Sequence, residues 1–442
     1  MSGAPQIVAE APADGRTVFR RRLADWTKIL SVYFTAQTLT QLLGIAAGLL
    51  FVNFLPTREF ALYTLASSVI TFFLFVSDLG STSSLVYFFH NVEGAVAEVR
   101  RYVAAVLSLR RVAFLLGVVA VLLVFPRMSA AAGFGLGESL PAAAGILICV
   151  WFQVSASIRV LSLRLADHYG QSYRAELVGG GVRLVLAAAL IAAGLLQAWL
   201  AVLVAAAGAA AVSIASRSKL YEGAARREGA DLGPYRRKVL RYLLPSLPSA
   251  LYFSIQGPLT VWLATTFGST RNIAEVGALG RLGLVVGIFS SLTGVVFLPR
   301  LARIHDNALY RTRFLQFGGL LAVVAAALLV AAAIAPGAFL WLLGRQYAEL
   351  RAELLLVVAG AGLTLLGGYL VSVNLARSWN RWEGLAVVLL IAVQAVLVAV
   401  LPLSTTSGVL TFNLLTAVTG LLLQAAISVA GFVRPGWVQW MT

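Results

Sequence analysis

SRSKLYEGAARREGADLGPYRRKVL, residues 216–240, is the longest hydrophilic connection between apolar segments of this 442-residue chain. Hydrophobic residues make up 60% of the sequence and charged residues only 12%, and the mean hydropathy is +0.88. Because a soluble domain has about a quarter of its residues charged, this composition indicates a membrane protein. Apolar runs of about 20 residues, long enough to cross the hydrocarbon core as helix, recur on both sides of the connection. They predict an α-helical bundle, since outer-membrane strands would read as short alternating segments.

We expect twelve transmembrane spans, six before the hydrophilic connection and six after it. The predicted bounds are 29–54, 61–88, 102–125, 141–165, 177–196, 198–215, 242–266, 274–298, 313–335, 353–375, 384–403 and 407–431. His90 and His305 follow spans 2 and 8 at matching positions, which favours two copies of one six-helix unit. An even number of spans per unit relates the copies by a pseudo-two-fold axis along the membrane normal. The predicted fold class is therefore all-α, with twelve helices in two six-helix bundles.

Basic residues predict the orientation and the domain organisation. The predicted domains are a cytoplasmic N-terminal tail (1–28), a six-helix lobe (29–215), a basic cytoplasmic linker (216–240), a second six-helix lobe (241–432) and a cytoplasmic C-terminal tail (433–442). The loops expected outside hold few basic residues, namely Arg58, Arg127, Arg271, Arg345 and Arg351. The positive-inside rule then predicts a multi-pass membrane protein with both termini in the cytosol. The formal charge of +16 is explained by this inner surface and its contact with anionic lipid, without a nucleic-acid partner.

Five charged residues fall inside the spans of the first lobe. They are Asp78, Arg110, Arg111, Arg159 and Arg183. Counted along the predicted spans, all five lie at a similar depth in the cytoplasmic third. Because an ion within the bilayer costs at least about 2.5 to 3.5 kcal/mol, such residues normally pair or line a cavity. One aspartate cannot neutralise four arginines, so the surplus predicts an anionic ligand in a chamber of the first lobe that opens to the cytosol.

Two alternatives remain open for these residues. Asp78 can bridge a single arginine and stabilise helix packing, while the other arginines extend to the headgroups. In the second lobe, Arg281 lies near the outer end of span 8, where it either holds a substrate anion or extends to the outer headgroups.

Span 7 contains Pro245, Pro248 and Pro258. Each proline removes a backbone hydrogen bond and tends to kink a helix. The three together predict either a gating helix or a statically bent one.

Sequence motifs of the common enzyme classes are missing. There is no phosphate-binding Walker sequence, no HExxH, no GxSxG and no Cys/His cluster. Cys149 is the only cysteine, so the chain forms no internal disulfide. We therefore expect neither an enzyme nor a bound metal or cofactor.

Residues 48–86 read GLLFVNFLPTREFALYTLASSVITFFLFVSDLGSTSSLV. This stretch resembles the start of Wzx-type flippases in the multidrug/oligosaccharidyl-lipid/polysaccharide superfamily. The resemblance rests on a short outer turn, on Glu59, Phe60 and Tyr63 after it, and on the Asp-Leu-Gly triplet that begins at Asp78. It implies a protein that moves an undecaprenyl-diphosphate-linked oligosaccharide from the inner to the outer leaflet by alternating access, for polysaccharide biosynthesis. The implied partners are this glycan lipid, the membrane lipids and a polysaccharide polymerase with its export machinery.

For such a function we assign roles to particular residues as hypotheses. Arg159 and Arg183 would contact the diphosphate, with Asp78 as their orienting partner, and Arg110, Arg111 and Arg281 would add positive charge. Gln153 and Gln256 would contact the sugars, and span 7 would move.

Three other classes compete with this interpretation. A cation-coupled exporter of small molecules from the same superfamily would be expected to have an acidic cavity. A major-facilitator carrier would carry a different loop after span 2, where this chain reads HNVEGAVAEVRR. A non-transporting scaffold of a polysaccharide synthase would need no cavity of substrate size.

Overall fold

The computed structural model describes residues 38–91, 96–166, 168–217, 232–244, 247–293, 297–302, 304, 306–377, 379 and 381–434. Every regular element in these ranges is a helix. Ten of the helices are long and apolar enough to span a membrane. The predicted N-terminal tail, His305 and Pro245 lie outside the described residues.

The first lobe contains the helices that precede the central linker. They are Thr38–Phe54, α2 (Thr57–Asp78), α3 (Ser81–Asn91), α4 (Val96–Ala131), α5 (Leu136–Leu165), α6 (Tyr169–Ala192) and α7 (Ala198–Ala215).

The second lobe follows the linker, whose described part folds as α9 (Gly233–Leu243). Its elements are α10 (Leu247–Phe267), α11 (Thr270–Leu292), α12 (Leu298–Ala302), α13 (Asn307–Ile334), α14 (Pro336–Leu343), η3 (Arg345–Tyr347), α15 (Arg351–Ala376), α16 (Glu383–Val400) and α17 (Thr406–Val433).

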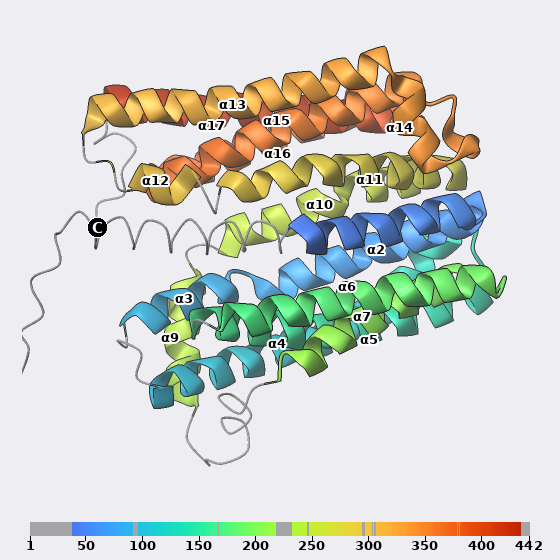
Figure 1. The fold of residues 1–442 in the computed structure, drawn as a ribbon, viewed down its shortest axis with the longest axis horizontal. Coiled ribbons are helices and arrows are strands. Elements are labelled where there is room, and N and C mark those ends of the chain that lie inside the picture. Colours follow the sequence, from blue (N-terminus) through green and yellow to red (C-terminus); the bar gives the residue numbers. More distant parts are fainter. Residues whose placement is uncertain are drawn as a thin grey trace, which may run out of the picture.

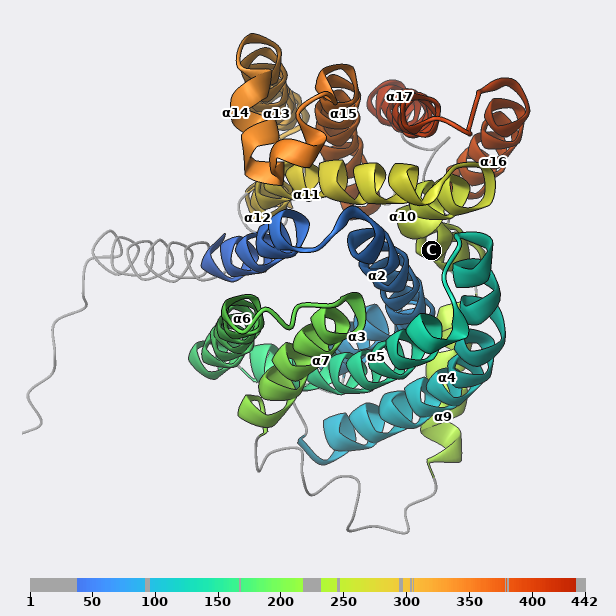
Figure 2. The same ribbon diagram turned by 90° about the vertical axis from the view of Figure 1, so that its right-hand side faces the viewer.

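The two lobes lie side by side with their helices along a common direction, as Figures 1 and 2 show. Packing follows the same order in both: α5 packs on α7 and α4 on α5 in the first lobe, while α15 packs on α17 and α13 on α15 in the second. Each of the twelve predicted spans contains helix. The prediction of twelve helices in two six-helix bundles is confirmed.

Span 2 is broken into two helices. It consists of α2 and α3, because Leu79 (φ 38°) and Gly80 (φ 83°) both adopt left-handed conformations that a helix cannot continue through. The single span predicted for residues 61–88 is therefore two helices. The described part of span 8 contains α11 and the short α12.

The ends of the bundle differ in charge. The end that carries α9, α12 and the start of α4 is called the basic end here, since it holds Arg100, Arg101 and the arginines of α9. The end that carries α14 and η3 is called the opposite end. In Figure 1 the basic end is on the left and the opposite end on the right. The sequence predicts that the basic end faces the cytosol.

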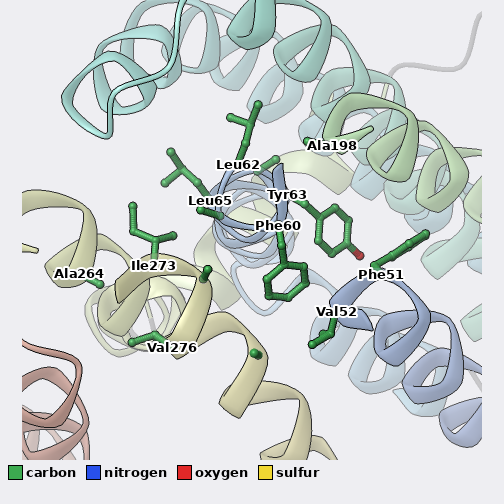
Figure 3. Close-up of a cluster of buried hydrophobic side chains, with 14 of the residues drawn as sticks. Phe51, Val52, Phe60, Leu62, Tyr63, Leu65, Ala198, Ala264, Ile273 and Val276 are labelled. Atoms are coloured by element: carbon green, nitrogen blue, oxygen red, sulfur yellow. The ribbon is translucent and has the colours of Figure 1, made fainter. Parts of the chain in front are cut away.

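The core near the opposite end is shared by both lobes. Figure 3 shows α2 at its centre, with Tyr63 next to Phe51 of the first helix on one side and Leu65 next to Ile273 of α11 on the other. Phe51, Phe60 and Tyr63 are almost completely buried, and the Phe51 and Tyr63 rings meet edge to face at 5.1 Å. α2 is therefore the element on which the two lobes meet.

Candidate functional site

Asp78 lies at the break between α2 and α3. One of its carboxylate oxygens accepts hydrogen bonds from the Ser81 hydroxyl (3.0 Å), the Thr82 hydroxyl (2.6 Å) and the Thr82 backbone N–H (3.1 Å). These contacts satisfy groups at the start of α3, as an N-cap residue does. Asp78 is therefore placed by the backbone break as well as by charge.

Arg110 of α4 is the ion-pair partner of Asp78. Its guanidinium group also donates to the hydroxyls of Ser81 (2.8 Å), Thr82 (2.9 Å) and Ser157 (2.8 Å). The side chain is only 4% exposed, so its contacts tie α2, α3, α4 and α5 together. The expectation that Asp78 orients Arg159 and Arg183 was wrong, because its carboxylate is engaged by Arg110.

Arg159 and Arg111 lie near the same level as this pair. Arg159 of α5 donates to the hydroxyl of Ser213 in α7 at 2.9 Å. Arg111, next to Arg110 on α4, is exposed. Asp78 stands 21 residues from the start of α2, about 31 Å along the helix, which is the full thickness of a hydrocarbon core. This basic layer therefore lies at the headgroup boundary of the basic end.

Arg183 lies at a different level from the other three arginines of the first lobe. It is nine residues from the end of α6, or about 14 Å from the opposite end. There it donates to the Tyr63 hydroxyl at 3.2 Å. The prediction of one common depth was wrong for Arg183, because α6 begins at Tyr169, well before the apolar run that marked the predicted span.

Arg281 approaches the same tyrosine from the second lobe. Its guanidinium carbon lies 5.5 Å from the centre of the Tyr63 ring, in cation–π range. Gly48 of the first helix leaves room for it, since an added Cβ there would meet the Arg281 side chain at 3.4 Å. Arg281 forms no ion pair with any residue that the structure describes. Tyr63 thus lies between a guanidinium group of each lobe.

A cavity of about 800 Å³ opens beside Arg281. It is enclosed by α2 on one side and by α10, α11, α15, α16 and α17 on the other. Thr64, Ser68 and Thr71 of the polar stripe on α2 line it, together with Gln256 and Thr260 of α10. The large cavity in the described part of the chain is therefore at the seam between the lobes and within the second lobe, not inside the first lobe as expected.

The charged residues in the cavity lining are Arg281 and Glu383. Glu383, at the start of α16, accepts a hydrogen bond from the Gln424 side chain at 3.0 Å. Most of the polar lining is otherwise uncharged. The cavity is consequently not the strongly cationic chamber that a count of charges per lobe predicted.

Two side-chain amides of the cavity lining, Gln256 and Gln424, are each hydrogen-bonded to a further amide side chain. The Gln394 amide donates to the Gln256 carbonyl oxygen at 3.0 Å, and Asn374 donates to the Gln424 side chain at 3.0 Å. Of the two residues predicted to contact sugars, Gln256 lines the cavity. Gln153 does not line this cavity, and its carbonyl oxygen is buried without a hydrogen-bond partner in the described structure.

Two polar residues of the cavity lining were missed by the sequence analysis. Gln424 and Asn413 are uncharged polar residues inside the strongly apolar helix α17, and that rarity was the available signal. Tyr63, which lies beside the cavity-lining Arg281, gave no signal beyond its place in the resemblance, because a tyrosine is ordinary in a membrane span.

The prolines of span 7 differ in their structural effect. Pro258 lies inside α10 and lines the cavity. Pro248 occupies the first turn of α10, where a helix has no internal partner for the missing N–H. The expectation of several interior breaks was therefore wrong for Pro248, and Pro258 remains the candidate bending point.

The lobes are joined by hydrogen bonds at the opposite end. Asn53 donates to the carbonyl oxygen of Leu342 (2.7 Å), and Gln346 donates to that of Val52 (2.9 Å). Thr57 also bonds to Gln346 at 3.0 Å. These contacts between the first helix pair and the α14–η3 loop, called the loop seam here, hold the opposite end together.

Acidic and metal-ligating residues do not cluster in the described part of the chain. No group of three or more His, Cys, Asp or Glu side chains there is placed to hold a metal ion. Cys149 is buried in α5.

Known protein families and curated proteins provide no match to this sequence. Solved structures do. The structure titled lipid II flippase MurJ, inward closed conformation, is similar over 91% of this chain and 89% of its own, with 13% identity and a TM-score of 0.71. An inward-facing MATE multidrug resistance transporter of the MOP superfamily is similar over 89% and 96%, with 17% identity and a TM-score of 0.58. The eukaryotic MATE transporter AtDTX14 is similar over 92% and 96%, with 10% identity and a TM-score of 0.60.

At these identities the likeness shows the fold. The chain has the polytopic helical fold of these three solved structures, over nearly its whole length.

Proposed function

We propose that this protein is a flippase that moves an undecaprenyl-diphosphate-linked oligosaccharide across the bacterial cytoplasmic membrane. The observation that carries the proposal is Arg281, which lines a cavity of about 800 Å³ at the lobe seam and has no acidic partner among the described residues. Arg281 is eleven residues from the start of α11, about 16 Å from the opposite end, so its charge lies within the hydrocarbon thickness. An anionic ligand would offset the cost of that charge.

A diphosphate matches the chemistry of this position. A guanidinium group donates two parallel hydrogen bonds to phosphate oxygens, which gives both affinity and orientation. Arg183 stands on the other side of Tyr63 and adds positive charge from the first lobe. We assign Arg281 as the main diphosphate contact and Arg183 as a supporting one, whereas Arg159 lies at the basic end, away from this position.

The remainder of the cavity suits a glycan. Gln256, Gln424 and Asn413 supply amide donors and acceptors of the kind that recognise sugar hydroxyls. The volume falls in the range of about 300 to 1,000 Å³ usual for ligand pockets. A non-transporting scaffold would need no such cavity, which disfavours that alternative.

The loop seam supports an alternating-access cycle. With the opposite end held together, a substrate would enter from the basic end, which we place in the cytosol with both termini. Opening of the loop seam would then release the glycan at the outer face, for synthesis of O-antigen, exopolysaccharide or capsule. The lipid-linked glycan, the membrane lipids and a polysaccharide polymerase are the proposed partners, and we propose a transporter and not an enzyme because the similar structures are transporters by their titles.

A second candidate is a MATE-like, cation-coupled exporter of small molecules. Glu383 favours it, because a carboxylate in the cavity lining can bind a cation. The similar structures also include multidrug resistance transporters by title. This candidate predicts that Glu383→Gln abolishes efflux of a cationic dye, while Arg281→Gln leaves it intact.

Binding to purified protein in nanodiscs distinguishes the two. We expect undecaprenyl diphosphate to bind more tightly than undecaprenyl monophosphate, and Arg281→Gln to weaken that binding about tenfold or more, as loss of a charged hydrogen-bond donor does. Arg271→Gln, on the same helix but ion-paired to Glu275 near the helix start, is the control and should stay within about twofold. Equal affinity for both lipids, or no effect of Arg281→Gln, would contradict the flippase proposal.

A further inference from the structure

A second, much smaller pocket lies between α4 and α5 near the basic end. It holds about 70 Å³ and is called the α4–α5 groove here. Its walls include Arg110, Arg111 and Phe114 from α4 and Trp151, Ser155 and Arg159 from α5. None of these residues lines the large cavity. The volume accommodates a few water-sized groups, such as the oxygens of one phosphate, and not a sugar chain.

The depth of the groove matches that of lipid phosphates. Arg111 is twenty residues before the end of α4, about 30 Å along the helix from the opposite end. Arg159 is 23 residues from the start of α5, or about 34 Å. Both arginines therefore lie at the basic-end edge of a hydrocarbon core about 30 Å thick.

The groove contains one positive charge that no described acidic residue neutralises. The carboxylate of Asp78 pairs with Arg110, and Arg159 hydrogen-bonds to Ser213. Arg111 makes no hydrogen bond or ion pair with any residue in the described ranges, and its side chain is exposed.

The surface next to Arg111 is apolar and faces outward. Leu115 and Leu116, one turn further along α4, are 65% and 69% exposed, as expected for a face that contacts lipid. Phe114 and Trp151 meet edge to face at 5.2 Å and close the groove on the side of the membrane centre. Guanidinium groups at headgroup depth followed by an apolar face complement an amphipathic lipid better than a soluble anion.

Additional positive charge surrounds the groove. The guanidinium group of Arg236 in α9 donates to the Ser108 hydroxyl at 2.7 Å, three residues before Arg111. Val239 and Leu243 are the buried face of α9, while Arg237, Lys238 and Arg241 of the same helix are exposed. Basic pockets and amphipathic basic helices at this membrane level attract anionic headgroups.

We propose that the α4–α5 groove binds the phosphate of an anionic phospholipid from the basic-end leaflet, with Arg111 as its main ligand and Arg159 as the second. The lipid chains lie along the apolar face of α4. This site is separate from the large cavity and does not depend on the proposed transport function.

The test is the affinity of the purified full-length protein for phosphatidylglycerol, measured by native mass spectrometry with phosphatidylcholine as the zwitterionic reference. We expect a preference for phosphatidylglycerol that Arg111→Gln reduces about fivefold or more, since one arginine near the surface contributes about 1 kcal/mol. Arg127→Gln makes the same charge change on the same helix near the opposite end, and should leave the affinity within about twofold. Because Arg111 is exposed and makes no hydrogen bond or ion pair with a described residue, its substitution should leave thermal stability unchanged.

The location is checked with phosphatidylglycerol brominated on its acyl chains near the headgroup. The brominated lipid should quench the fluorescence of Trp151, which is the component present in the parent protein and missing in Trp151→Phe. Arg111→Gln should weaken that quenching. Equal effects of Arg111→Gln and Arg127→Gln on phosphatidylglycerol affinity would overturn the proposal. The proposal would also be overturned if Arg111→Gln lost binding of undecaprenyl diphosphate but kept binding of phosphatidylglycerol. The α4–α5 groove would then bind the polyprenyl lipid and not a phospholipid.

Discussion

Asp78 combines two physical roles in one side chain. Its carboxylate caps the start of α3 and neutralises Arg110, a guanidinium group that is almost fully buried. Its depth and its pairing with some arginine follow from the cost of an ion in the bilayer. Which arginine it pairs with does not follow, because Arg110, Arg111 and Arg159 are equivalent when depth is counted along separate helices.

Removal of the carboxylate should destabilise the first lobe. Asp78→Asn leaves Arg110 buried without a counter-charge, at a cost of about 3 kcal/mol, the low end for a broken buried pair since the Asp78 side chain is 35% exposed. We expect the melting temperature in detergent to fall by about 5 °C. Asp78→Asn combined with Arg110→Met should recover part of this loss, because no unpaired charge remains.

Arg111→Gln is the matched control for Asp78→Asn. Arg111 follows Arg110 directly in α4, and it makes no hydrogen bond or ion pair with a described residue. It should leave the melting temperature unchanged. If Asp78→Asn were as stable as Arg111→Gln, the pair would contribute nothing to the fold.

At the scale of elements, hydropathy predicts where helices cross the membrane but not where they begin and end. α6 starts at Tyr169, and Arg174 and Glu176 in its first turns gave no apolar signal, so Arg183 was placed at the wrong depth. The break between α2 and α3 was missed because Leu79 and Gly80 are themselves apolar. The position of the cavity was missed because charges were counted separately in each lobe. In the structure, α2 of the first lobe forms one wall of the cavity, and helices of the second lobe form the other walls.

The contact between α2 and α11 depends on a glycine. A Cβ atom at Gly277 would lie 2.2 Å from the Thr64 hydroxyl oxygen, closer than any real contact. Gly277→Ala should therefore push the helices apart and cost about 1 to 3 kcal/mol, measured as a lower melting temperature. Gly280→Ala, in the same helix with nothing within 4 Å, should not.

Thr64→Ala should relieve part of the clash, because it removes the two atoms that would lie closest to the new methyl group. A Gly277→Ala variant that is as stable as Gly280→Ala would show that α2 and α11 are not in close contact.

At the scale of the whole molecule, the loop seam should control access to the outer face. In a background without the native cysteine (Cys149→Ala), the pair Thr57→Cys and Gln346→Cys replaces side chains that are hydrogen-bonded at 3.0 Å. We expect a short, reducible bifunctional thiol reagent to cross-link this pair in the resting protein and to stop transport, and a reductant to restore it. Thr57→Cys alone is the control. Quantitative cross-linking that left transport unchanged would exclude opening at the loop seam.

The flippase proposal is tested most directly by the transfer of a fluorescent undecaprenyl-diphosphate-linked sugar between the leaflets of proteoliposomes, followed by its exposure to a membrane-impermeant quencher. We expect faster transfer than in protein-free vesicles. The rate for Arg281→Gln should be about one tenth of the parent rate or lower, and the rate for Arg271→Gln should be similar to that of the parent. A rate in the parent protein equal to that of protein-free vesicles, or one that Arg281→Gln leaves unchanged, would contradict the flippase proposal.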